Sequence, residues 1–253
     1  MSGARVSAAL LALVVVTLAA CGGQDADVSG GQDADVSGSV PSERIESYEA
    51  MTVEALGQVE ELWGADSVSR PVEVVLPASG AEFEALTGVF TAVPATTVGS
   101  LQEARVVVHP DSWGLLTPEG RQAVLTHEVT HLSQQGDGTV PAWLGEGLAE
   151  YTAHRDSDLP PTTLAGSALD DVRAGVLPST WPDPAAAGTS WDGYALSWLA
   201  CLYIAETWSE SALLELYETV AAGTVLSEAV PVVLNMSEAE LLTGWAQWLE
   251  NLA

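Results

Sequence analysis

The chain has 253 residues, 47% of them apolar, which is enough to bury the core of one sizeable domain or two small ones. Its 35 acidic residues outnumber 7 basic residues, all of them arginine, and the formal net charge is -28. Such a surface repels phosphate backbones and anionic lipid headgroups, so nucleic acid is excluded as an expected partner. Of the two cysteines, Cys21 and Cys201, the first falls in a targeting signal, and no internal disulfide is therefore expected.

Residues 1–20 are predicted to be a lipoprotein signal peptide. Arg5 precedes the apolar run Ala8–Ala20, which is shorter than the roughly 20 residues of a membrane-spanning helix. The run ends in Leu-Ala-Ala-Cys, which resembles a bacterial lipobox. The resemblance implies that Cys21 is lipidated and anchors the protein to the cell membrane outside the cytoplasm. The alternative is an ordinary signal peptide with a chance cysteine.

Residues 21–41 are predicted to form a flexible acidic tether that starts at the lipidated cysteine. The octapeptide GQDADVSG occurs at 23–30 and again at 31–38, and it is rich in Gly, Ser and Asp. Such a composition is typical of a spacer. The sequence therefore predicts a folded domain over 42–253, held off the membrane by this segment.

The expected elements place strands early and helices late, which indicates an α+β domain and not a series of alternating strand–helix units. Helical spacing and strand-like runs predict, in chain order, a helix over 42–62, a strand over 72–76, a helix near 82–86 capped by Ser79, a strand over 105–109, helices over 118–135 and 141–155, a loop over 159–190, and helices over 191–208, 211–222 and 237–252. The strand near 105–108 is the candidate sheet edge for an extended peptide.

The segment His127-Glu128-Val129-Thr130-His131 carries the metal chemistry. Histidines four residues apart on a helix share one face, so both imidazoles can reach one cation. Glu128 lies about 100° around the helix from His127 and can address a water on that cation. This is the H-E-x-x-H pattern of metalloproteases. The alternative is a pair of histidines on a solvated helix face.

A second acidic pair follows on the next predicted helix, in Trp143-Leu144-Gly145-Glu146-Gly147-Leu148-Ala149-Glu150. A catalytic zinc ion takes three protein ligands and keeps one position open. Glu146 is the candidate third ligand. Glu150, one turn later, is a candidate to accept a hydrogen bond from a ligating histidine. The alternative is two exposed acids on a very acidic surface, although like charges at this spacing repel each other.

These two segments resemble the gluzincin zinc peptidases, particularly the bacterial peptidase MA-like branch. The resemblance spans about residues 70 to 210 and is specific only over 127–151. It implies a zincin-like fold with a small N-terminal β-sheet, an H-E-x-x-H helix and a helical C-terminal half. It also implies Zn²⁺ as cofactor, Glu146 as the third ligand, and Tyr194 on a following helix as a transition-state hydrogen-bond donor. Two departures are the short spacing from His131 to Glu146 and the lack of a G-x-M-E-N exopeptidase element.

The expected activity is zinc-dependent hydrolysis of a peptide or protein substrate, with the lack of that exopeptidase element favouring an endopeptidase. Glu128 is the expected general base. The alternative is a catalytically silent surface lipoprotein with the same fold that acts as a binding or assembly module. A solute-binding lipoprotein is a third reading, but it would lack the ligand triad. His154 is either a residue of the same cleft or a structural histidine in the last helical turn, and the sequence does not predict an oligomeric state.

Overall fold

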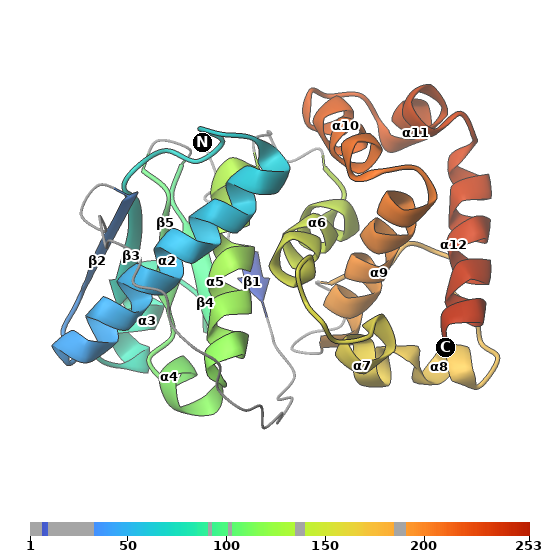
Figure 1. Cartoon of the computed structure of the whole chain (residues 1–253). Coiled ribbons are helices and arrows are strands. Elements are labelled where there is room, and N and C mark those ends of the chain that lie inside the picture. The colour runs from blue at the N-terminus through green and yellow to red at the C-terminus, as the bar shows by residue number, and fades with distance from the viewer. Residues whose placement is uncertain (1–6, 10–32, 91–92, 101–102, 135–139, 185–190) are drawn as a thin grey trace. The chain divides into compact units, whose positions relative to one another are not determined.

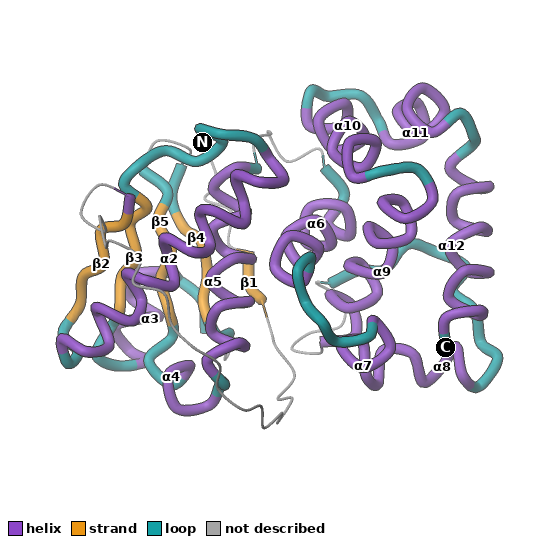
Figure 2. The backbone as a smooth tube through the Cα atoms, viewed as in Figure 1, coloured by secondary structure: helices purple, strands orange, loops and turns teal. Residues whose placement is uncertain are grey.

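The computed structural model describes residues 7–9, 33–90, 93–100, 103–134, 140–184 and 191–253 (Figure 1). The chain divides into two compact units, Met1–Ser133 and Gln134–Ala253. All strands of the described residues lie in the first unit, and the second is helical (Figure 2). The predicted α+β class, with a small N-terminal sheet and a helical C-terminal half, is confirmed.

The first unit is built on a mixed sheet with the strand order β1-β4-β5-β3-β2. Its strands are β1 (Ser7–Ala9), β2 (Ala34–Gly38), β3 (Val72–Leu76), β4 (Ala95–Val98) and β5 (Arg105–Val108). β2, β3 and β5 are parallel, whereas β4 runs antiparallel to both β5 and β1. The expectation that residues 105–108 form a sheet edge is therefore wrong. Val106, Val107 and Val108 are all buried, and a continuous apolar run of this kind is typical of an interior strand.

Residues 33–38, from the second copy of the repeated octapeptide, are part of the fold, which corrects the predicted tether at these positions. Residues Ala34–Gly38 form β2, whose register pairs Ala34 with Val72 and Val36 with Val74. Ala34 and Val36 are buried while Asp35 and Ser37 are exposed, so the short segment alternates with the period of a strand. The Asp33 carboxylate also lies 2.9 Å from the Arg70 guanidinium. The first copy, like Cys21, lies outside the described residues.

Helices cover both faces of this sheet. The helices of the first unit are α2 (Ser42–Trp63), α3 (Gly80–Thr87), α4 (Ser112–Leu115) and α5 (Pro118–Ser133). Val74, Val106 and Val108 pack in one cluster with α2 and α5, which lie side by side in Figure 1. Val107 faces the other way and packs with Phe83 of α3. This opposition follows from the two-residue period of a strand, which sends neighbouring side chains to opposite faces.

The second unit is a set of packed helices around α6 and α9. Its helices are α6 (Ala142–His154), α7 (Pro161–Ala165), the 3₁₀ helix η1 (Gly166–Leu169), α8 (Asp170–Arg173), α9 (Trp191–Thr207), α10 (Glu210–Ala221), α11 (Leu226–Leu234) and α12 (Glu238–Leu252). Among the described residues, no helix is both long and apolar enough to cross a membrane.

Most of the predicted helices are confirmed within one or two residues of their expected ends. Two departures from prediction concern helices of the second unit. The predicted loop over 159–190 contains three short helices, which begin at Pro161, and single turns of this length carry little periodicity in sequence. The helix α11 was missed because Pro231 lies inside it, and an internal proline removes a backbone hydrogen bond.

Candidate metal centre

The two candidate histidine ligands lie on α5 of the first unit, one within a buried stretch of the helix and one directly after it. Every residue from Ala123 to Thr130 is buried, and His127 and Glu128 are 0% exposed. Val124, Leu125 and Val129 supply the apolar contacts that hold this helix on the core. Apolar burial thus encloses a short polar stretch, which argues against histidines on a solvated helix face.

Polar contacts also fix α5 to the neighbouring helix α2. The Thr126 hydroxyl donates to Oε1 of Gln58 at 2.7 Å. Nε2 of Gln122 donates to the Met51 carbonyl at 3.1 Å. Two such bonds on successive turns limit how far α5 can slide or rotate, so the residues between and after them have fixed positions.

The two imidazoles of α5 converge on one point. Nε2 of His127 lies 3.0 Å from Nε2 of His131, and the rings meet edge to face with an interplanar angle of 82°. Two ligand atoms about 2.0–2.1 Å from a tetrahedral zinc ion are roughly 3.4 Å apart, so the observed separation is close to that of a ligand pair. The spacing of four residues achieves this convergence, as the sequence predicts.

Glu128 is held by a strand residue that sequence reasoning did not find. The Thr97 hydroxyl on β4 lies 2.8 Å from Oε2 of Glu128 and 2.9 Å from the main-chain carbonyl of the same residue. The run Ala95-Thr96-Thr97-Val98 has the β-branched composition of a strand and could have been predicted as one. Its contact with a residue 31 positions away could not, because that contact depends on how the helix lies on the sheet.

The candidate glutamate ligand is carried by α6 in the second unit. Gly147, directly after Glu146, lets this helix approach α9 closely. A Cβ atom at Gly147 would lie 2.4 Å from the Ser197 carbonyl oxygen, closer than real Cβ contacts allow. The Gln134 side chain donates to the Gly145 carbonyl at 2.8 Å, just before the glutamate. Packing against α9 and this hydrogen bond fix the turn of helix that carries Glu146.

One ligand atom from each of His127, His131 and Glu146 lies within 4.8 Å of the other two, and the three residues form a group that could hold a metal ion. His127 is buried, and the other two are partly buried. Two imidazoles and one carboxylate are the donor set of many catalytic zinc sites, in which the fourth position stays open. The side chains present therefore fit zinc by donor chemistry and by the separation of the two ring nitrogens.

The second acid of α6, Glu150, is fully buried, so the alternative of two exposed surface acids is wrong for it. Oε2 of Glu150 lies 3.4 Å from Nε2 of His154, one turn further along the helix. The His154 ring packs against Trp198, with centroids 5.5 Å apart, and against Trp191 at 6.1 Å. These contacts favour a structural role for His154 in the last turn of α6 over a role in the cleft. A hydrogen bond from Glu150 to a ligating histidine stays a prediction.

Three other residues of interest lie as follows. Tyr194 is in the first turn of α9 and is 7% exposed, and its role as an oxyanion donor stays a prediction. Cys201 is buried on the same helix, and burial raises the pKa of its thiol, as expected for an inert thiol. The His109 ring packs edge-on against Phe83, with centroids 4.9 Å apart, which is a structural contact.

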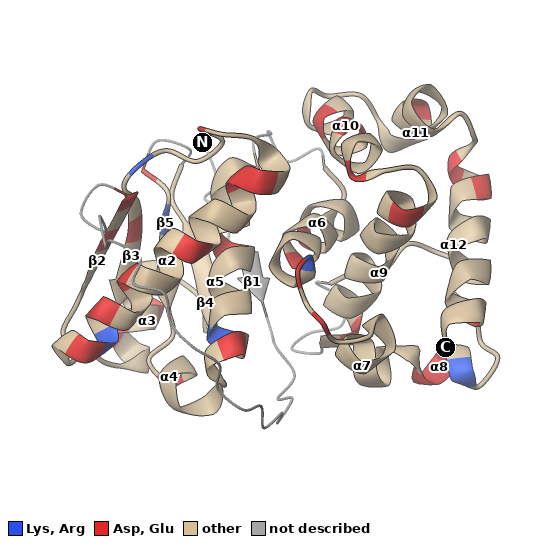
Figure 3. Cartoon of the chain, in the orientation of Figure 1, with Lys and Arg blue, Asp and Glu red and all other residues tan. Residues whose placement is uncertain are grey.

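Acidic residues are spread over the described helices of both units, and basic residues are few (Figure 3). No protein-family model matches the chain, and no curated protein matches it. The feature that points to a function is the group of three residues that could hold a metal ion, in an α+β fold.

Proposed function

We propose that this chain is a zinc-dependent peptide-bond hydrolase of the gluzincin type, acting as an endopeptidase. The observation that carries the proposal is the group His127, His131 and Glu146, with the buried acid Glu128 next to the first histidine. Burial of a carboxylate costs free energy, so its position beside the candidate ligands is informative.

In this proposal His127, His131 and Glu146 hold Zn²⁺. A zinc ion held there would supply a lowered pKa for a water molecule and polarisation of a carbonyl group. Glu128 accepts the proton of that water and passes it to the leaving nitrogen. Tyr194 donates a hydrogen bond to the substrate oxygen on which negative charge develops.

The sheet offers a place for an extended peptide at the outer side of β4. In the structure, residues Ser7–Ala9 pair antiparallel with Ala95–Thr97 there. If residues 1–20 are removed as a signal peptide, β4 loses this pairing. Its main-chain groups on that side can then bind a substrate strand. Glu128 contacts the same strand through Thr97, which brings the proposed base to the strand that would align the peptide.

A hydrolysis assay tests this proposal. The mature chain should cleave an unstructured protein substrate. Cleavage should stop after treatment with a zinc chelator and resume when zinc is restored. The matched variant is Glu128→Gln, which keeps the size of the side chain but cannot accept the proton. We expect it to retain zinc and to lose roughly 10²–10⁴-fold in kcat. Near-normal activity in this variant would move the base to another residue.

The rival function is a silent zincin-fold lipoprotein that binds or assembles partners. Such a module has no use for an acid at position 128, and Glu128 is present and buried. A zinc-loaded chain that cleaves no protein substrate in the same assay would favour this rival.

We also propose that the protein is anchored outside the cytoplasm through a lipid on Cys21. The support is the lipobox-like sequence that ends at this cysteine and the Gly- and Asp-rich residues that follow it. Two or more acyl chains bind a membrane stably, whereas one does so marginally. Mass spectrometry of the mature N-terminus should find a lipidated cysteine, and a product cleaved at another residue would overturn the anchor.

A further inference from the structure

The contact between Thr97 and Glu128 suggests a further role at the proposed active site. The hydroxyl of Thr97 lies within hydrogen-bonding distance of two oxygens of one residue, Oε2 at 2.8 Å and the main-chain oxygen at 2.9 Å. Both residues belong to the first unit, so the contact lies within one compact body. A side chain on a strand thus contacts both the backbone and the carboxylate of the proposed base.

The hydroxyl has one proton and two acceptors. A charged acceptor forms the stronger hydrogen bond, so an ionised Glu128 draws the proton of Thr97 to Oε2. That oxygen is then engaged by Thr97. Because Thr97 also contacts the main-chain oxygen of the same residue, it fixes this carboxylate oxygen relative to the helix backbone.

The donor itself is held firmly. Thr97 lies within β4, where it pairs with Val106 of β5, a strand that has neighbours on both sides. Threonine is branched at Cβ, which restricts its χ1 angle more than that of an unbranched residue. A hydroxyl on such a residue in a paired strand has a well-defined position, unlike one on a long surface side chain.

We propose that Thr97 is a positioning residue for Glu128, which holds the carboxylate in the orientation that its proposed role as general base requires. This inference rests on the proposed hydrolase function. It adds a residue on β4 to the working site, and it makes the strand that would align the peptide also the strand that orients the base.

The competing explanation is that Thr97 only ties the helix to the sheet through the Glu128 carbonyl. In that case removal of the hydroxyl lowers stability but leaves the carboxylate where it is. The two explanations differ in the conformation of Glu128 and in kcat, and both quantities can be measured.

The test compares Thr97→Val, which replaces the hydroxyl with a methyl group, with Thr97→Ser, which keeps it. The control is Thr52→Val, because the Thr52 hydroxyl is also buried in the first unit but donates to the Tyr48 carbonyl. For each mature variant we would measure zinc content, kcat and KM on a peptide substrate, and the Glu128 side chain in crystals of the chelator-treated protein. If the valine variant does not fold, Thr97→Ala removes the hydroxyl with less steric change.

We expect Thr97→Val to keep its zinc and KM, to lose roughly 10–100-fold in kcat, and to show the Glu128 carboxylate displaced or in two conformers. The serine variant and the Thr52 control should match the parent chain. The inference is overturned if the valine variant keeps both kcat and the Glu128 conformer, or if serine does no better than valine. Should the zinc-loaded parent chain be inactive, the hydrolase proposal fails, and the conformer of Glu128 in the metal-free crystals still decides the positioning role.

Discussion

The helices α5 and α6 each carry a fully buried acid, but they hold it in different ways. Glu128 on α5 accepts a hydrogen bond from the neutral hydroxyl of Thr97. Glu150 on α6 lies against the imidazole of His154, which is itself packed among tryptophans. Glu128 is thus held by a strand residue 31 positions away in the sequence, whereas the partner of Glu150 lies one turn further along the same helix. We propose proton transfer for the first acid, and hydrogen bonding to a ligating histidine stays our prediction for the second.

The largest effect expected in the helical unit concerns Tyr194. We assign this residue a direct part in the reaction chemistry, whereas Glu150 acts only through a metal ligand. Tyr194→Phe removes one oxygen and little packing. If the hydroxyl donates to the substrate oxygen, kcat should fall by roughly 10²–10³-fold, with zinc content and unfolding temperature unchanged. A folded, zinc-loaded variant with the kcat of the parent chain would make Tyr194 an ordinary core residue and confine the chemistry to α5.

The next test asks whether the second acid supports the metal. Glu150→Gln should weaken zinc affinity by roughly 10–100-fold, the usual effect of losing a carboxylate behind a ligand. Glu146→Gln should weaken it further, because Glu146 is the proposed ligand. Competition with a metal-binding dye would measure both. The reverse order would show that the two acids have been exchanged in our assignment.

A pair of glycine substitutions tests whether close packing against α9 positions α6. Gly147→Ala places a methyl group against the Ser197 carbonyl, and should destabilise the protein by about 1–3 kcal/mol because α6 and α9 must move apart. The control is Gly57→Ala on the exposed side of α2, where a Cβ atom meets nothing within 4 Å. That change should stabilise by up to about 1 kcal/mol. Urea unfolding measures both, and equal effects would show that α6 does not depend on this close approach.

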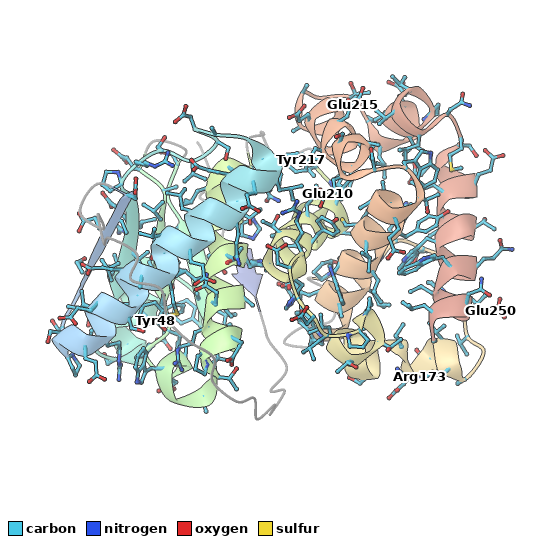
Figure 4. The ribbon with its side chains drawn as sticks, in the orientation of Figure 1. Tyr48, Arg173, Glu210, Glu215, Tyr217 and Glu250 are labelled. Atoms are coloured by element: carbon cyan, nitrogen blue, oxygen red, sulfur yellow. The ribbon has the colours of Figure 1, made fainter. Side chains whose placement is uncertain are left out.

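The smallest effect involves the ion pair at the end of α6, where Arg155 and Tyr151 both donate to Glu210 on α10. Glu210 is labelled in Figure 4. The hydrogen bond from Arg155 lowers the pKa of Glu210. A lowered pKa in the folded state stabilises the protein above the ordinary carboxyl range, and this stabilisation is lost as the pH falls through the lowered pKa. Arg155→Met should therefore cost about 0.5–1 kcal/mol at pH 7, since the pair is partly exposed, and less in acid.

The pH dependence of unfolding checks this last prediction. The control is Arg173→Met, because Arg173 pairs with the largely exposed Asp170 and should contribute less. A deficit in Arg155→Met that stays constant from pH 7 into acid would contradict the assignment to Glu210.

The local features of both regions could be predicted from sequence, and the contacts between distant segments could not. Helical periodicity places His127 and His131 on one face, and the sequence Trp-Leu-Gly-Glu-Gly marks Glu146 by resemblance. The strand β2 was missed because its composition is that of a spacer, and the alternation of Ala34 and Val36 is too short to outweigh it. Thr97 was missed because its function depends on packing between a strand and a helix that are far apart in sequence.

The most direct test of the central claim is the zinc content of the purified mature chain and of its His131→Ala variant. We predict close to one zinc ion per chain in the parent protein and loss of that ion in the variant, because removing one of three ligands leaves a two-residue site. His109→Ala serves as the matched control, since His109 packs against Phe83 and is not one of the proposed ligands. A His131→Ala chain that keeps its full zinc content would contradict the ligand assignment, and with it the account of the metal centre.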